Sequence, residues 1–92
     1  MIQVEQVIEE IRATRREIEE IEETEYSPDG LVAATVSGSG KLLELDLDPR
    51  IYRHHDTRVL SASILSAVNE ANVRAHRRIA ELAQRLAPSG RR

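Results

Sequence analysis

The stretch GLVAATVSGSGKLLELDLD, residues 30–48, decides the fold of this chain. Apolar residues recur at every second position in residues 32–36 and again in residues 43–47, on either side of Gly38-Ser39-Gly40. Alternation with a period of two buries one face of a strand and exposes the other. Gly38-Ser39-Gly40 supplies the positive φ angles that a short hairpin turn requires. The segment therefore predicts two antiparallel strands with one apolar face each, made by Val32, Ala34 and Val36 and by Leu43, Leu45 and Leu47.

The segments on either side of this hairpin must cover its apolar face, because an isolated hairpin is not stable in water. A third strand is predicted over residues 24–27, where Pro28 ends it, so that residues 24–48 form a three-stranded antiparallel meander. Asp48-Pro49 then predicts a helical turn, since aspartate caps helices well and proline suits their first position.

Residues 2–22 are predicted to form a helix with an apolar seam whose members step by three and four residues, as in a coiled coil. A seam of three heptads fits a helix packed on the sheet of its own chain, and it also fits a helix packed against a partner chain. Thr14 is a weak point or a register device within it. The candidates for a dimer interface are Val4, Val7, Ile11, Ile18 and Ile21.

Residues 57–87 are predicted to form a second long helix, because apolar residues from Leu60 to Leu86 follow a period near 3.6. Asp56 or Thr57 would cap it. Residues 88–92 are expected to be a flexible basic tail. The sequence thus predicts one domain over residues 1–92, of the α+β class, with the order α-β-β-β-α.

Size and composition favour a dimer. The chain has 92 residues, no cysteine and only two tyrosines as aromatic residues. A core this small leaves a single chain marginally stable, and oligomerisation is a common remedy. With no apparent leader and no apolar run of membrane-spanning length, we expect a cytoplasmic protein with no membrane contact.

Charge is divided unevenly along the chain. Residues 1–49 carry four basic and thirteen acidic groups, whereas residues 50–92 carry nine arginines and three acidic groups. The net charges of −9 and +6 sum to −3. This division predicts either internal charge complementarity or a surface in the second half that meets a polyanion.

The candidates for nucleic-acid contact are arginines of the second half: Arg53, Arg58, Arg74, Arg77, Arg78 and Arg85. Contacts of this kind to phosphates give salt-sensitive binding with little sequence preference. The near absence of aromatic residues removes the stacking surfaces used for single strands and RNA loops, so double-stranded DNA is the expected ligand. Alternatively, these arginines neutralise the acidic residues 17–25, within one chain or across a dimer.

No catalytic or cofactor chemistry is expected. Gly38-Ser39-Gly40-Lys41 lacks the spacing of a phosphate-binding loop, and a strand follows it where a helix should. His54, His55 and Asp56 have no second group of ligands that would complete a metal site. We therefore expect no enzyme activity, no cofactor and no bound metal.

The pattern G-L-V-x-x-T-V-x-G-x-G-x-L-x-x-L-x-L-D-P over residues 30–49 resembles the YbaB/EbfC family, as does I-L-x-A-V-N-E-A over residues 64–71. This resemblance implies a nucleoid-associated DNA-binding protein of bacteria, acting as a homodimer whose sheets join and whose long helices project. The first helix departs from the family pattern, because it is rich in Glu and Ile rather than Met, Gln and Lys. We therefore expect weak, micromolar binding of DNA.

The arginine-rich composition resembles actinobacterial members of that family. Some of those are associated with type VII secretion loci and look like protein-binding chaperones. The alternative function is therefore a helical protein-interaction or chaperone-like module without meaningful DNA binding.

Overall fold

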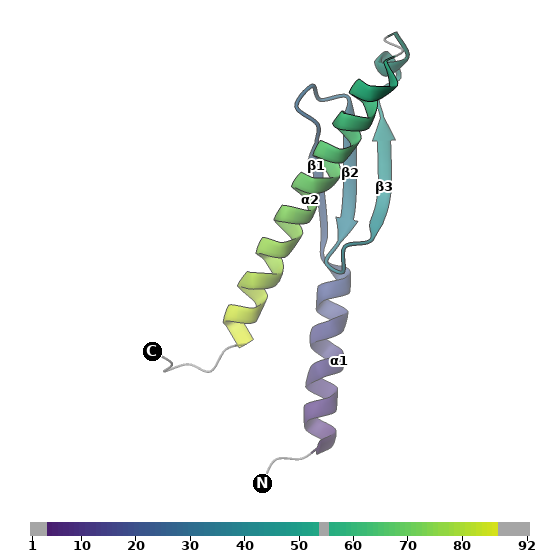
Figure 1. The fold of residues 1–92 in the computed structure, drawn as a ribbon. Helices are drawn as coiled ribbons and strands as arrows, with labels where there is room; N and C mark the ends of the chain where they lie inside the picture. Colours follow the sequence, from purple (N-terminus) through teal and green to yellow (C-terminus); the bar gives the residue numbers. More distant parts are fainter. Residues whose placement is uncertain (1–3, 54–55, 87–92) are drawn as a thin grey trace.

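The computed structural model of this chain describes residues 4–53 and 56–86. It confirms the predicted α-β-β-β-α order, and Figure 1 shows α2 lying across the sheet while α1 extends away from the sheet's end. Residues 1–3, 54–55 and 87–92, which include the predicted basic tail, lie outside the described residues. The elements are α1 (Val4–Glu20), β1 (Glu22–Tyr26), β2 (Val32–Ser37), β3 (Leu42–Leu47), the 3₁₀ helix η1 (Pro49–Arg53) and α2 (Thr57–Leu86).

The first strand starts two residues earlier than predicted, because the first helix ends at Glu20 instead of residue 22. Ile21 is buried in the core, and its carbonyl accepts a hydrogen bond from the Gly38 N–H at 3.1 Å. This contact draws the chain out of the helix. The glutamates that follow consequently alternate across a strand, so that Glu23 and Glu25 are half-buried while Glu22 is exposed.

The hairpin between β2 and β3 is confirmed, but its two glycines serve different purposes. The Gly40 N–H donates to the Ser37 carbonyl at 3.0 Å, and Gly40 has the positive φ, 88°, that a three-residue hairpin loop requires. Gly38 does not have a positive φ, contrary to expectation. A Cβ at Gly38 would lie 2.1 Å from the Ile18 carbonyl oxygen, so it is close approach of α1 that requires glycine here.

The core lies between β2 and α2. Five of its side chains are fully buried: Val32, Ala34, Val36, Ala67 and Ala71. The alanines allow the helix to approach the sheet closely, as their small size predicts. β2 lies in the middle of the sheet, with β1 and β3 antiparallel on its two sides.

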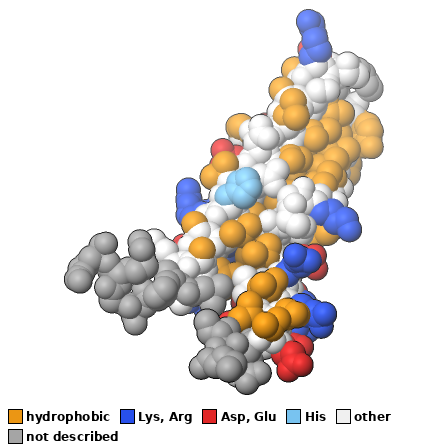
Figure 2. All heavy atoms as spheres, turned by 60° about the horizontal axis from the view of Figure 1, so that its bottom comes forward, with side chains coloured by type: hydrophobic (Ala, Val, Ile, Leu, Met, Phe, Trp, Pro, Cys, Tyr) orange, Lys and Arg blue, Asp and Glu red, His pale blue; other side chains and the backbone are white. Residues whose placement is uncertain are grey.

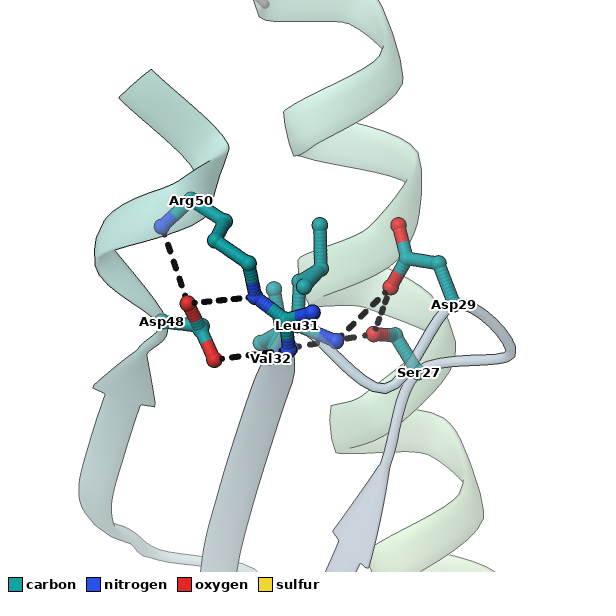
Figure 3. Close-up of polar contacts among 6 residues, drawn as sticks. All are labelled: Ser27, Asp29, Leu31, Val32, Asp48 and Arg50. Carbon is teal, nitrogen blue, oxygen red and sulfur yellow. Dashed lines mark hydrogen bonds and ion pairs between the residues drawn. The ribbon is translucent and has the colours of Figure 1, made fainter. Parts of the chain in front are cut away.

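The loops that flank the sheet are held by aspartates (Figure 3). Asp48 accepts hydrogen bonds from the Arg50 backbone N–H at 2.8 Å and from two guanidinium nitrogens of Arg50 at 3.1 and 3.0 Å. These bonds lower the pKa of the Asp48 carboxyl and raise that of Arg50. The predicted cap at Asp48 is thereby confirmed, as is the cap of α2 by Asp56, whose carboxylate accepts from the Arg58 N–H at 3.0 Å.

The turn between β1 and β2 is built around Asp29 (Figure 3). Its carboxylate accepts hydrogen bonds from the Ser27 hydroxyl at 2.5 Å, the Leu31 N–H at 3.0 Å and the Ser63 hydroxyl of α2 at 3.3 Å. The bond from Ser27, and then that from Leu31, lowers the pKa of Asp29. This turn therefore joins the sheet to the first part of α2.

The chain is elongated, with extents of 65 × 28 × 15 Å and a radius of gyration of 18.1 Å. A compact domain of this length would have a radius of gyration of about 12 Å. The elongation arises because α1 extends beyond the end of the sheet (Figure 1), which leaves no residue of α1 buried. Within the described residues, no helix combines the length and apolar character needed to span a membrane.

Candidate nucleic-acid interface

Three of the six predicted arginines form ion pairs with acidic side chains of the same chain, and two of these, Arg74 and Arg78, pair with glutamates of β1. Arg74 Nε lies 3.0 Å from a carboxylate oxygen of Glu25 and 3.8 Å from one of Glu23. Arg78 Nη1 donates a hydrogen bond to the other carboxylate oxygen of Glu23. The alternative role of the arginines, neutralisation of acidic residues, thus applies to Arg74 and Arg78, and the acidic partners lie on β1 rather than on the first helix.

Arg77 and Arg85 are exposed and form no ion pair with any residue that the structure describes. Arg77 lines a hollow of about 250 Å³ that it shares with Glu81 and with the paired side chains described above. Arg85 lines a second hollow, of about 300 Å³, together with Glu17 and Glu20 of α1. These two arginines are available to an external anion, although carboxylates lie near both.

Arg53 and Arg58 lie at the other end of the molecule. Arg53 ends η1, and the Arg58 side chain, 95% exposed, lies 3.9 Å from its capping residue Asp56. The helical rise places Arg58 about 40 Å from Arg85 along α2. The six predicted residues therefore form two separate groups and not one patch.

The predicted dimer-interface residues also divide into two groups. Val4, Val7 and Ile11 expose 72%, 39% and 53% of their surface, and Ile18 is half-buried. Ile21, in contrast, packs in the core of its own chain against Val36, Ala71 and Ala75. The core of one chain therefore accounts for the apolar residue at position 21, whereas Val4, Val7 and Ile11 remain exposed in the single chain.

A further apolar surface lies on β3 and was not among the predicted site residues. Leu42, Leu43 and Leu45, which we call the leucine surface, expose 47%, 44% and 37% of their area because α2 packs on β1 and β2. Figure 2 shows a band of hydrophobic side chains on the side of the molecule where β3 lies in Figure 1.

The register explains how one of these leucines joins the surface. A shift between Thr35 and Val36 places Leu42 opposite Val36, on the apolar side, whereas strict alternation assigned it to the polar side. The alternation itself was visible in the sequence, but this bulge was not.

The structure tests part of what the sequence suggested about a phosphate-binding loop and a metal site. Gly38 to Lys41 forms the hairpin turn that leads into β3, which confirms its interpretation as a turn. His54 and His55 lie outside the described residues. In the part of the chain that is described, no three His, Asp or Glu side chains are grouped as a metal site requires.

The sequence profile of the YbaB/EbfC DNA-binding family matches residues 1–90. This chain belongs to that family. Among its relatives, a nucleoid-associated protein of Rhodococcus opacus (strain B4) is 33% identical over 88 residues, which are 96% of this chain and 75% of the relative. One from Brucella ovis is 31% identical over 86 residues, or 94% and 80% of the two chains. One from Saccharopolyspora erythraea is 35% identical over 72 residues, or 78% and 62%.

Among solved structures, the crystal structure of an uncharacterized protein from Helicobacter pylori is similar to this chain. The TM-score is 0.69, at 19% sequence identity, with 91% of this chain and 98% of the other covered. At this identity the similarity concerns the fold alone.

The structure explains why the YbaB/EbfC motif identifies the fold better than a ligand site. Within residues 30–49, Gly40 supplies a positive φ, Gly38 accommodates α1, and Asp48 caps η1. All six candidate arginines lie outside both stretches of the motif. The candidate residues for DNA contact are therefore side chains that the motif does not contain.

Proposed function

We propose that this chain binds double-stranded DNA without sequence preference, as a homodimer, in the bacterial nucleoid. The observation that carries the proposal is a group of four arginines on α2, which we call the arginine row: Arg74, Arg77, Arg78 and Arg85. Within this row, Arg77 and Arg85 are exposed and form no ion pair with a described residue. Guanidinium groups on a helix surface bind phosphates, which gives affinity but carries no sequence information. The family to which the chain belongs is one of DNA-binding proteins, and the relatives from Rhodococcus and Brucella are named nucleoid-associated proteins.

The homodimer is supported by two exposed apolar surfaces, the leucine surface and the seam of α1. Exposed apolar surfaces of this kind mark interaction sites. The arginines that reach β1 and the leucine surface on β3 lie at opposite edges of the sheet. A second copy can therefore cover the leucines and still leave the arginine row open to DNA.

Weak affinity follows from the acidic residues close to the arginines. Glu23 and Glu25 already neutralise part of the row, and Glu17 and Glu20 line the hollow beside Arg85. Carboxylates repel phosphate over roughly a Debye length, about 8–10 Å at physiological salt. We expect micromolar rather than nanomolar dissociation constants.

The test is a fluorescence-anisotropy titration of two unrelated duplexes across a series of salt concentrations. Both duplexes should bind equally, and Arg77→Ala should weaken both alike while reducing the salt slope by about one unit. Arg12→Ala, which removes the same charge from an exposed site on α1, is the matched control and should have a smaller effect. Absence of binding at about 50 mM salt, or a strong preference for one duplex, would contradict the proposal.

The second candidate function is a helical protein-interaction module without meaningful DNA binding, as in chaperone-like proteins associated with type VII secretion. It is favoured by the seam of α1, which exposes Val4, Val7 and Ile11. Light scattering distinguishes the two uses of this seam. A mass near 10.4 kDa with cooperative unfolding would leave the seam open to a different helical protein, whereas twice that mass favours a second copy.

A further inference from the structure

The paired glutamates of β1 are placed where an external anion would bind. The Glu23 side chain is only 14% exposed and meets both Arg74 and Arg78, and the Glu25 side chain, 28% exposed, meets Arg74. The side chains of Arg74 and Arg78 remain about half exposed. DNA can therefore approach these arginines from solvent while the glutamates hold them from the side of the sheet.

Carboxylate and phosphate require the same donors of a guanidinium group. Both accept charge-assisted hydrogen bonds from its N–H groups, in single or paired geometry. Arg78 donates such a hydrogen bond to Glu23, and Arg74 forms ion pairs with Glu23 and Glu25, so neither guanidinium group is available in full to a phosphate oxygen. The two anions consequently compete for the same arginines.

We propose that Glu23 and Glu25 act as an internal competitor that holds Arg74 and Arg78 away from DNA phosphate. The proposal rests on the DNA binding proposed above and concerns the regulation of that surface. Arg77 and Arg85 then make the first contacts with a duplex, and Arg74 and Arg78 join only when phosphate displaces the glutamates. The competitor lowers the affinity for DNA and the number of phosphates bound.

The test compares Glu23→Gln and Glu25→Gln with Glu22→Gln in the anisotropy titration. All three remove one negative charge from the same strand at nearly constant shape, but Glu22 is exposed and forms no ion pair with a described residue. Each paired glutamate that is replaced should tighten binding about two- to five-fold, the equivalent of one surface ion pair. Glu22→Gln should change affinity less, since it acts only through the screened long-range charge.

Two further measurements assign the gain to the arginines. In the double variant Glu23→Gln/Glu25→Gln the salt slope should steepen by about one unit for each arginine that gains a phosphate. In an Arg74→Ala/Arg78→Ala background, the same two glutamate replacements should no longer tighten binding beyond the Glu22→Gln control. Thermal melting checks the fold of every variant. If Glu23→Gln does not fold, the comparison is made between Glu25→Gln and Glu22→Gln, since Glu25 is more exposed than Glu23.

The outcomes separate this proposal from DNA binding itself. Equal effects of Glu22→Gln and Glu25→Gln, or weaker binding by Glu25→Gln, would overturn the competitor. Binding by wild type that is weakened in Arg77→Ala would still support the DNA-binding function. Binding by the double glutamate variant alone would overturn the DNA-binding function proposed for the wild-type chain but would support the internal competitor. No binding by either protein at about 50 mM salt would overturn both.

Discussion

The two long helices of this chain are both amphipathic, yet only one of them is buried by the chain itself. α2 contributes the fully buried Ala67 and Ala71 to the core, whereas α1 contributes no buried residue. Small residues in the middle of the α2 stripe let it pack closely on a thin sheet, and the larger residues of the α1 seam have no such surface within reach. An apolar stripe therefore indicates that a helix has a partner, but not which chain provides it.

This difference gives α1 and α2 different roles in stability. Changes to the stripe of α2 should affect the fold of every chain. Changes to the seam of α1 should affect association between chains. The following variants test this division, beginning with the largest expected effect.

Ala71→Asp should unfold the chain or destabilise it by about 3–5 kcal/mol, because it buries an unpaired carboxylate in the core between α2 and β2. Ala80→Asp introduces the same charge on the exposed side of α2 and should change the free energy of unfolding by less than about 0.5 kcal/mol. Urea titrations followed by circular dichroism measure both. A stable Ala71→Asp protein would show that α2 does not form the core as described.

Gly38→Ala should destabilise the chain by about 2–4 kcal/mol, since its Cβ would meet the Ile18 carbonyl oxygen at 2.1 Å. Gly40→Ala is the natural comparison. The new Cβ would have open space around it, so only the positive φ of residue 40 lowers the free energy of unfolding, by about 1–2 kcal/mol. If the two variants unfold at the same urea concentration, the close approach of α1 is not what requires glycine at position 38.

Ile11→Asp should convert the proposed homodimer to monomers while the folded chain loses less than about 1 kcal/mol, because Ile11 is exposed in the single chain. Light scattering should give 10.4 kDa in place of twice that mass. Gln6→Asp adds the same charge to α1 outside the seam and should leave the dimer intact. Loss of association in Gln6→Asp as well would point to charge on α1, and not to the seam, as the cause.

The smallest effect should come from Asp29, which joins the sheet to α2. Its pKa is lowered in the folded chain by hydrogen bonds from Ser27 and Leu31, so its contribution to stability is present above the ordinary value of 3.8 and is lost as the pH falls below it. The melting temperature of Asp29→Asn should therefore decline less than that of wild type between pH 5 and pH 3. Parallel pH curves for the two proteins would contradict this role of Asp29.

Local patterns predicted the elements of this fold because each depends on neighbours in sequence. The alternation in β2, the stripe of α2 and the caps at Asp48 and Asp56 are examples. The end of α1 was predicted less accurately because it depends on the bond between Ile21 and Gly38, which are far apart in sequence.

The candidate site was harder to predict for the same reason. Exposed arginines on the second helix were identified from spacing alone. The pairing of Arg78 with Glu23 joins residues 55 positions apart, and no local pattern encodes it. The positions of the positive charges can therefore be predicted from the sequence. Their neutralisation by glutamates becomes visible only when α2 is seen packed against β1.

The way in which α1 projects from the end of the sheet (Figure 1) has a mechanical consequence. Its 17 residues form an arm about 25 Å long that meets the sheet near Gly38. A tilt of about 10° at this joint would displace the far end of the arm by about 4 Å, and by twice as much between the two copies of the proposed homodimer. Because glycine at position 38 leaves room for the Ile18 carbonyl oxygen, a larger residue at this joint would move the whole arm.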